Sequence, residues 1–318
     1  MTLKVFLSGT GYTKHHFQSL SEHGFEITHE PGFISQNDLI RNLSQYHAYV
    51  LGGDERLTDI ELQHAKHLKL ISFVGTGYTS FIDESAAQKY RIAIKNTPAV
   101  MAPAVAEHTI GLILGLQRRL FAQNWRAKQG TSIPYEVNEL SSLCVGIVGL
   151  GEIGARVARI LRSGFGSQVI YTSRTRKPQL EAELALTFVT METLFSSADI
   201  IVLALPTHPE TEFFVNDTLL TKVQKGAMLV NTAGAKLVEP NALRKHLVSQ
   251  QLGAAAFDGY YIEPLPHPSE DPYHLLSLTD EQFIVTPHTA AKTNQSWHRM
   301  LDMSINNVLG YFSEAACV

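Results

Sequence analysis

Cysteine is scarce in this chain, since only Cys144 and Cys317 occur among its 318 residues. Cys144 lies in an apolar strand pattern and Cys317 near the extreme C-terminus, so neither a disulfide framework nor a thiolate metal site is expected. Long apolar runs are also missing, because none approaches the roughly 18 residues that span a bilayer. The N-terminus, MTLKVFLSGT, passes directly into a strand pattern without the features of a cleavable signal. These absences predict a cytoplasmic protein that binds no metal ion and no membrane.

A block of basic residues is absent as well. The net charge is −4 and the pI about 6.4, so binding to nucleic acid is not expected. Low-complexity tracts are missing, and a content of 44% hydrophobic and 18% charged residues is typical of a folded globular chain. Because single cores seldom grow past about 250 residues, a chain of 318 residues predicts two domains.

Apolar runs typical of buried strands alternate with helical stretches along most of the chain. In the first hundred residues these runs are LKVFL, FEITHE, AYVLGG, LKLISFVG and IAIKN. A second series begins at LCVGIVGLG and continues through VIYTS, DIIVLALP, AMLVNTA, AAAFDGYY and FIVTPH. Continuous apolarity indicates strands buried on both faces, as in parallel sheets with crossover helices. The expected fold class is therefore α/β, with two doubly wound parallel-sheet domains of Rossmann or flavodoxin type.

The segment between the two series is predicted to be one helix. Residues 103–125 begin with proline and are apolar all round in their first half, PAVAEHTIGLIL. A helix buried so fully lies between two layers, so we interpret it as the connector between the domains. Its apolar face over 103–116 also predicts the contact of a homodimer. A polar surface loop is expected over 126–142 and a final helix over 293–312.

A glycine-rich turn opens the second series. The stretch VGIVGLGEIGARVARIL places Gly149, Gly151 and Gly154 in GxGxxG spacing, directly after an apolar strand and before an amphipathic helix. The three glycines permit a tight turn, close approach of the backbone to a pyrophosphate, and close packing of helix on strand. Although the pattern alone also fits a structural turn, its setting between a strand and a helix predicts a dinucleotide-binding site.

The end of the next strand predicts which dinucleotide binds. An acidic residue there would bond the ribose 2′-hydroxyl of NAD, but the sequence is YTSRTRK, with Ser173 in that place. Arg174, Arg176 and Lys177 follow, and guanidinium groups suit a 2′-phosphate. The alternative is a solvated basic loop without a ligand. We expect NADP(H) in preference to NAD(H).

A histidine follows the last expected strand. In FIVTPHTA, His288 comes directly after the strand and a proline, at the carboxyl end of a parallel sheet, where such folds bind ligands. A lone histidine is more often a surface or core residue, but two carboxylates precede this one. Asp258 ends another strand, and Glu263 follows it by five residues. A carboxylate that orients a histidine is a common way to build a proton donor near neutral pH.

The chain resembles the D-2-hydroxyacid dehydrogenase family, in particular its glyoxylate/hydroxypyruvate reductases. The resemblance spans essentially the whole chain and rests on VGTGYTSFID, NTPAVMAPAVAEHTIGLIL, VGIVGLGEIG, LPTHPET, LVNTA, AAFD with EPLP, and VTPHTA. The SRTRK run is similar to the NADPH-preferring glyoxylate reductase branch. The family implies two domains with a cleft between them for the substrate. The substrate-side domain would comprise 1–100 plus 289–318, and the dinucleotide-binding domain 101–288.

The resemblance also implies roles by position. His288 would be the acid/base that gives a proton to the substrate's carbonyl oxygen, and Glu263 its orienting partner. Asp258 would lie beside the nicotinamide carboxamide. Further cofactor contacts implied by position, besides the glycines, Ser173, Arg174 and Arg176, are Glu152, Ile153, Pro206, Thr211, Thr232, Ala233 and His288 itself. Backbone amides around Gly75, Thr76 and Gly77 would hold a substrate carboxylate.

One position departs from the family. Members usually read NTARG before LVD, and the arginine binds the substrate's carboxylate and carbonyl oxygen. This chain reads NTAGAKLVE, with the family spacing of 27 positions between Asn231 and Asp258, so Gly234 stands where the arginine would be. Loss of one preorganised donor to a developing oxyanion typically costs a factor of about 100 to 1,000 in rate. Lys236 or Arg299 are the two candidates for a replacement cation.

Two functions of different kinds follow from these observations. The retained His288 and Glu263 predict a reductase that transfers a hydride between NADP(H) and a 2-keto or 2-hydroxy acid or a related carbonyl compound. Gly234 leaves open the alternative of a catalytically retired family member that binds NADP(H) as a sensing or interaction module. The presence of the acid/base pair favours the enzyme, and Gly234 places activity on ordinary 2-keto acids in doubt.

Overall fold

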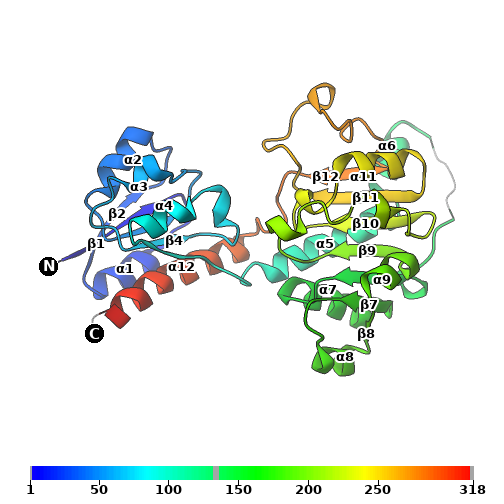
Figure 1. Cartoon of the computed structure of the whole chain (residues 1–318), viewed down its shortest axis with the longest axis horizontal. Coiled ribbons are helices and arrows are strands. Elements are labelled where there is room, and N and C mark those ends of the chain that lie inside the picture. The colour runs from blue at the N-terminus through cyan, green and yellow to red at the C-terminus, as the bar shows by residue number, and fades with distance from the viewer. Residues whose placement is uncertain (1, 132–135, 316–318) are drawn as a thin grey trace. The chain divides into compact units, whose positions relative to one another are not determined.

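The computed structural model describes residues 2–131 and 136–315, and these residues form two compact units. Unit 1 comprises Met1–Met101 and Thr293–Val318, and unit 2 comprises Ala102–Lys292. Each unit is a parallel sheet covered by helices on both faces (Figure 1). The predicted fold class of two parallel-sheet α/β domains is therefore confirmed. The cleft predicted between the domains remains a prediction.

Unit 1 is built on a five-stranded parallel sheet in the order β2-β1-β3-β4-β5. Its strands are β1 (Leu3–Ser8), β2 (Phe25–Glu30), β3 (Ala48–Leu51), β4 (Leu70–Phe73) and β5 (Ala93–Lys95). Its helices are α1 (Lys14–Glu22), α2 (Gln36–Leu43), α3 (Asp59–Leu62), α4 (Glu84–Lys89) and α12 (Asn294–Ala315). The final helix joins this unit although most of the chain separates it from β5 in sequence.

Side chains on the two faces of this sheet form two cores, as the alternation along β1 illustrates. Val5 and Leu7 pack with residues of α1 and α12, among them Leu301, whereas Phe6 packs on the other face with Leu39 of α2. Both faces of the strands are thus buried, which explains their continuous apolarity in sequence.

Unit 2 is built on a seven-stranded parallel sheet in the order β12-β11-β10-β9-β6-β7-β8. Its strands are β6 (Cys144–Val148), β7 (Gln168–Thr172), β8 (Thr187–Phe188), β9 (Ile200–Leu203), β10 (Ala227–Asn231), β11 (Leu252–Asp258) and β12 (Phe283–Thr286). Its helices are α5 (Ala102–Gln117), α6 (Leu120–Lys128), α7 (Glu152–Ile160), α8 (Pro178–Leu184), α9 (Met191–Ser197), α10 (Asp217–Leu220) and α11 (Pro240–Val248). The strand order reverses direction between β6 and β9, and ligands of such sheets bind at the carboxyl ends beside this reversal.

The helix predicted over 103–125 is two helices. It breaks after Gln117, where Arg119 has a left-handed φ of 50°, and α6 then begins at Leu120. The prediction of a dimer contact on the 103–116 face needs correction as well. Ile110, Leu112, Ile113 and Leu116 are buried within unit 2, because α5 packs on its sheet and against α7. The apolar character of α5 is thus explained inside one chain and carries no argument for a homodimer.

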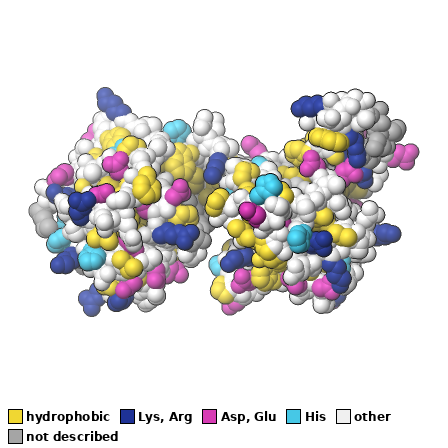
Figure 2. Space-filling model, turned by 90° about the horizontal axis from the view of Figure 1, so that it is seen from above, with side chains coloured by type: hydrophobic (Ala, Val, Ile, Leu, Met, Phe, Trp, Pro, Cys, Tyr) yellow, Lys and Arg dark blue, Asp and Glu magenta, His cyan; other side chains and the backbone are white. Residues whose placement is uncertain are grey.

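The sequence predicted that the chain has no membrane span, no metal site and no reactive cysteine. The structure bears on these predictions only through the residues that it describes. No helix there is both long and apolar enough to cross a bilayer, and no three His, Cys, Asp or Glu side chains there could hold a metal ion together. Cys144 is partly buried, and this burial raises the pKa of its thiol, which disfavours the reactive thiolate. Cys317 lies outside the described residues. On the face shown in Figure 2, acidic and basic side chains are interspersed over each unit.

Candidate active site

The glycine turn after β6 brings backbone close to backbone at Gly149 and Gly154. Gly149 has a φ of 97°, and a Cβ there would lie 2.5 Å from the carbonyl oxygen of Ala204. At Gly154 a Cβ would lie 2.1 Å from the carbonyl oxygen of Gly149, so this glycine lets α7 pack against the turn. Gly151 is the N-cap of α7, provides no side-chain cap, and has open space where a Cβ would be. The first-turn amides of α7, at Glu152 and Ile153, are therefore free to bind an anion.

The basic loop after β7 presents its two arginines differently. Arg176 forms hydrogen bonds of 2.8–3.1 Å with both carboxylate oxygens of Glu181, and its guanidinium lies 5.8 Å from the ring centre of Phe188. This guanidinium, helped by the Tyr171 hydroxyl, lowers the pKa of Glu181 and keeps the pair charged. Arg174 is exposed and has no hydrogen bond or ion pair with the described residues.

Ser173 closes the start of this loop, since its hydroxyl donates to the carbonyl oxygen of Thr175 at 2.8 Å. Two guanidinium groups were predicted to bind the 2′-phosphate, and that of Arg174 is available without breaking an existing ion pair. The Arg176 guanidinium would have to leave Glu181 first.

The loop after β10 is organised by the Asn231 side chain. Its Oδ1 accepts from the amides of Ala233 and Gly234, at 3.1 and 3.2 Å, and its Nδ2 donates to the carbonyl oxygen of Gly234 at 2.8 Å. The Thr232 hydroxyl donates to Thr109 Oγ1 on α5 at 2.8 Å, because the Thr109 proton is used in a bond to Val105 O. The predicted cofactor-lining residues Thr232 and Ala233 are thus held in one conformation.

The loop after β9 is closed by Thr211. Its Oγ1 accepts from the amide of His208 at 2.8 Å and lies 3.1 Å from the carbonyl oxygen of Pro206. Thr211 therefore has a structural contact that fixes the loop from Pro206 to Glu212, and any contact with a cofactor would be additional.

Gly234 has a backbone conformation that side chains rarely adopt. Its φ is 154°, and a Cβ there would lie only 2.4 Å from Thr207 Oγ1. Lys236, one candidate replacement cation, has its ammonium 3.8 Å from the Glu212 carboxylate. Arg299, the other, belongs to unit 1, where its Nε donates to the carbonyl oxygen of Val100 at 2.9 Å. A replacement role for either cation stays a prediction.

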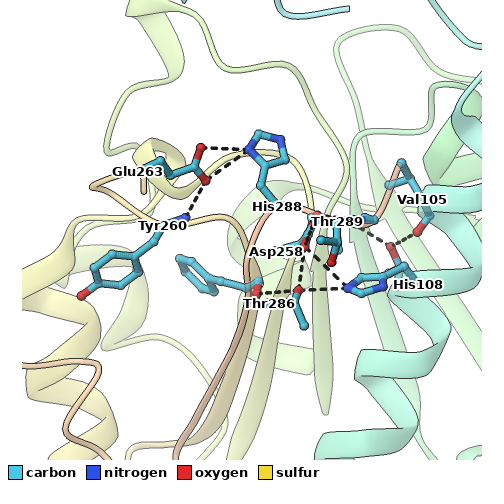
Figure 3. Close-up of polar contacts among 12 residues, drawn as sticks. Val105, His108, Asp258, Tyr260, Glu263, Thr286, His288 and Thr289 are labelled. Carbon is cyan, nitrogen blue, oxygen red and sulfur yellow. Dashed lines mark hydrogen bonds and ion pairs between the residues drawn. The ribbon is translucent and has the colours of Figure 1, made fainter. Parts of the chain in front are cut away.

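His288 and Glu263 lie side by side, as predicted for an acid/base pair (Figure 3). The imidazole Nδ1–H donates to the Glu263 carboxylate, whose two oxygens are both 3.1 Å away. Gly259 leaves room for that carboxylate, because a Cβ there would lie 2.9 Å from Glu263 Oε1. The His288 side chain is 68% exposed, so its Nε2 is accessible. Glu263 thus fixes the ring and keeps the proton on Nδ1, which makes Nε2 the nitrogen that can exchange a proton.

Asp258 anchors the segment that carries His288. Its side chain is only 2% exposed and accepts from the Thr286 hydroxyl at 2.6 Å and from the amides of Thr289 and Ala290 at 2.8 Å each (Figure 3). Since the Thr286 proton goes to Asp258, Thr286 Oγ1 accepts from His108 Nε2 at 3.0 Å. Asp258 therefore holds the chain on both sides of His288, whose φ of 54° is unusual for a residue other than glycine.

We expect Asp258→Asn to destabilise unit 2. An amide has one acceptor oxygen, so a backbone N–H of Thr289 or Ala290 loses its partner, and the free energy of unfolding falls by about 1–3 kcal/mol. Urea denaturation measures this loss. Asp280→Asn, at an exposed position, is the matched control. Equal unfolding free energies for the two variants would contradict the anchoring role of Asp258.

The predicted carboxylate-binding residues lie in unit 1, at the carboxyl end of β4. Gly75 has a φ of 155°, and its carbonyl oxygen accepts from both the amide and the hydroxyl of Thr97. Asn96 Nδ2 donates to the carbonyl oxygen of Thr76 at 2.9 Å. Thr76 and Gly77 are exposed residues, and their amides have no hydrogen-bond acceptor among the described residues. Two adjacent free N–H groups are suited to an anion.

Sequence analysis missed several residues that shape the site. The Thr207 hydroxyl contacts Gly234, and the Tyr261 hydroxyl donates to the carbonyl oxygen of Val238, just beyond Gly234, at 2.8 Å. The sequence assigned Asn231 no role beyond its spacing from Asp258, whereas in the structure its side chain holds the loop after β10. For Thr207 the available signal was its position directly after Pro206, in the loop that follows β9 beside the reversal point. No pattern in the sequence indicated which of its neighbours it would contact.

Comparisons with known proteins identify relatives of this chain and structures with the same fold. Residues 110–290 match the family described as "D-isomer specific 2-hydroxyacid dehydrogenase, NAD binding domain". A glyoxylate reductase from Thermococcus kodakarensis is 30% identical over 98% of this chain and 93% of its own length. Another from Aeropyrum pernix is 33% identical over 79% of this chain and 75% of its own length. A solved structure of the pyruvate reductase of Chlamydomonas reinhardtii, 26% identical, covers 98% of this chain and 97% of that one, with a TM-score of 0.81.

Proposed function

The chain belongs to the D-isomer specific 2-hydroxyacid dehydrogenase family of oxidoreductases, and we propose that it reduces a carbonyl compound to an alcohol with NADPH. The observation that carries this proposal is the His288–Glu263 pair, at the carboxyl edge of the sheet that also bears the glycine turn. The relatives named glyoxylate reductase and pyruvate reductase support a 2-keto acid or a related carbonyl compound as substrate.

The residues present fit a dinucleotide. Gly149 and Gly154 make room for backbone to approach backbone, and Gly151 leaves open space before the first-turn amides of α7, where the pyrophosphate would bind. Thr232, Ala233 and the loop from Pro206 would line the remainder of the cofactor. When bound, NADPH supplies the hydride that the carbonyl carbon receives.

The proton comes from the chain itself. His288, protonated on both nitrogens, gives its Nε2 proton to the carbonyl oxygen, which becomes the hydroxyl of the product. Glu263 keeps the Nδ1 proton in place and stabilises the charged ring before transfer. Because His288 is exposed, water can return a proton to Nε2 after each turnover. Binding of a substrate carboxylate by the amides of Thr76 and Gly77 stays a prediction from sequence.

We expect Arg174→Gln to weaken the binding of NADPH but not of NADH. A charge-assisted hydrogen bond to the 2′-phosphate would be lost, so the Kd for NADPH rises roughly 10- to 100-fold. Fluorescence titration of both cofactors measures the two Kd values. Arg176→Gln serves as the comparison, with a smaller expected rise because Arg176 is already paired with Glu181. Equal Kd values for NADPH and NADH in the parent protein would contradict the preference for NADP(H).

A retired family member is the second candidate function, and Gly234 is the observation that favours it. Such a protein would bind NADP(H) tightly and transfer no hydride, acting as a sensing or interaction module. Steady-state oxidation of NADPH with a panel of 2-keto acids, aldehydes and cyclic ketones separates the two. Turnover of any of them supports the enzyme, and tight NADPH binding without turnover supports the module. A homodimer and a cytoplasmic location stay predictions from sequence.

A further inference from the structure

Two adjacent polar side chains of α5 contact the ends of two strands of unit 2. α5 is mostly apolar, but His108 and Thr109 lie side by side in it. Thr109 Oγ1 lies 2.8 Å from Thr232 Oγ1, just beyond β10. His108 Nε2 lies 3.0 Å from Thr286 Oγ1, at the end of β12. The second contact reaches the segment that carries His288, only two residues after Thr286.

The imidazole of His108 determines which way the Thr286 hydroxyl points. Thr286 Oγ1 lies 2.6 Å from Asp258 Oδ1 and 3.4 Å from the carbonyl oxygen of Phe257, so its single proton has two acceptors within reach. The Nε2–H of His108 donates to this oxygen and leaves the hydroxyl proton for the shorter bond, to the buried carboxylate. With its proton on Nδ1 instead, His108 would compete with Asp258 for the hydroxyl proton.

The bond between Thr286 and Asp258 fixes the backbone around His288 (Figure 3). The His288 amide donates to the carbonyl oxygen of Thr286 at 2.8 Å. Beyond His288, the amides of the next two residues donate to the Asp258 carboxylate at 2.8 Å each. Asp258 thus holds this short segment at both ends, and His108 orients the bond at the first end. Because the φ of His288 is 54°, its conformation depends on such support.

We propose that His108 is a positioning residue for His288. Its Nε2–H orients the Thr286 hydroxyl toward Asp258, and Asp258 then holds the backbone that aims the His288 imidazole. This inference rests on the proposed reductase function and adds to it a residue that acts through Thr286 and Asp258 rather than on the substrate. What matters at position 108 is therefore a hydrogen-bond donor, and an apolar side chain of the same bulk does not replace it.

Two variants of His108 separate the donor from the bulk. His108→Leu fills the space without an N–H, so kcat for the best substrate of the panel should fall roughly 3- to 10-fold, the equivalent of one hydrogen bond. The KM for that substrate and the Kd for NADPH should change far less. His108→Gln keeps an N–H donor and should recover most of the kcat.

His246→Leu is the matched control for a structural effect. His246 is another buried histidine of unit 2, and its Nε2 lies 2.9 Å from Asp217 Oδ1. Loss of this contact should lower the melting temperature and leave kcat as it is in the parent. The melting temperature, measured for every variant, identifies misfolding.

A double-mutant cycle tests whether His108 acts through Thr286. Thr286→Val removes the hydroxyl that joins His108 to Asp258, so it should lower kcat at least as much as His108→Leu does. Adding His108→Leu to Thr286→Val should then cause little further loss. Fully additive losses of the two substitutions would overturn the inference.

The ¹⁵N NMR spectrum of protein labelled in its histidines gives a readout that needs no turnover. At a pH where the rings are neutral, the two nitrogens of His288 should show the proton on Nδ1, and the His288→Gln spectrum identifies their signals by absence. His108→Leu should move these signals toward a mixture of the two tautomers, because the ring no longer faces Glu263 in one orientation. His108→Gln and His246→Leu should leave them in place.

These measurements distinguish failure of the inference from failure of the proposed function. A folded His108→Leu variant with the kcat and the His288 signals of the parent would overturn the inference alone, as would equal losses in His108→Leu and His108→Gln. A parent that reduces no compound of the panel would overturn the proposed function. The ¹⁵N signals would in that case still decide whether His108 positions the ring of His288.

Discussion

Replacement of His288 by Gln is expected to lower kcat/KM for any reduced substrate by about 10²- to 10⁴-fold, the usual contribution of a positioned general acid. Glutamine can still bond to Glu263, but it has no proton that it can transfer and regain near neutral pH. The Kd for NADPH should change far less than kcat/KM, because the glycine turn and the basic loop are not altered. Steady-state kinetics and a fluorescence titration on the same preparation measure both quantities.

Two further variants define the role of the pair. His64→Gln changes an exposed histidine of unit 1 and should leave the kinetics as they are. Glu263→Gln should have an intermediate effect, since it keeps the shape of the contact with His288 Nδ1 and removes its charge. Full activity of a folded His288→Gln variant would show that the proton comes from another group.

Replacement of Gly154 by Ala is expected to damage both folding and cofactor binding. In an open helix position this change stabilises by about 0.5–1 kcal/mol, but here the added Cβ would lie 2.1 Å from the carbonyl oxygen of Gly149. The turn and α7 must therefore move apart. We expect the free energy of unfolding to fall by about 1–3 kcal/mol, as for overpacked sites, and the NADPH Kd to rise about tenfold or more.

Gly111→Ala is the matched control for that prediction. Gly111 lies in α5, and a Cβ there would meet nothing within 4 Å, so this variant should be as stable as the parent or slightly more so. Denaturant unfolding and NADPH titration of the two alanine variants make the comparison. A Gly154→Ala variant that unfolds and binds NADPH like Gly111→Ala would contradict the close packing of α7 on the turn.

The strands of the fold were predictable because both faces of each sheet are buried. Val5, Phe6 and Leu7 illustrate the rule, since each side chain enters one of two cores and the run is apolar throughout. The break between α5 and α6 was not predictable, because it depends on the left-handed conformation of Arg119, a residue that also suits a helix interior. Burial of the α5 face within unit 2 likewise depends on tertiary packing, which an apolar stripe does not specify.

The site was predictable where local sequence determines local geometry. The glycine spacing specifies the turn, and His288 was placed beside Glu263 through the resemblance to a family. The contact of Thr207 with Gly234 was not predictable, because it joins loops from two strands that are neighbours only in the folded sheet. The pairing of Arg176 with Glu181 also depends on folding, since α8 must turn back toward the end of β7. Charge alone therefore assigned Arg174 and Arg176 the same role, whereas the structure distinguishes them.

Transfer of a labelled hydride tests the central claim most directly. NADPH carrying deuterium at the transferable position of its nicotinamide would be incubated with the purified chain and each compound of the panel of 2-keto acids, aldehydes and cyclic ketones, and the alcohol that forms would be analysed by mass spectrometry. The account predicts that the alcohol carries one deuterium on its new carbinol carbon, that the His288→Gln variant forms this product far more slowly, and that no label enters without the protein. Tight binding of the cofactor with the label retained in it, for every compound of the panel, would contradict the account and identify a protein that binds the dinucleotide without using it.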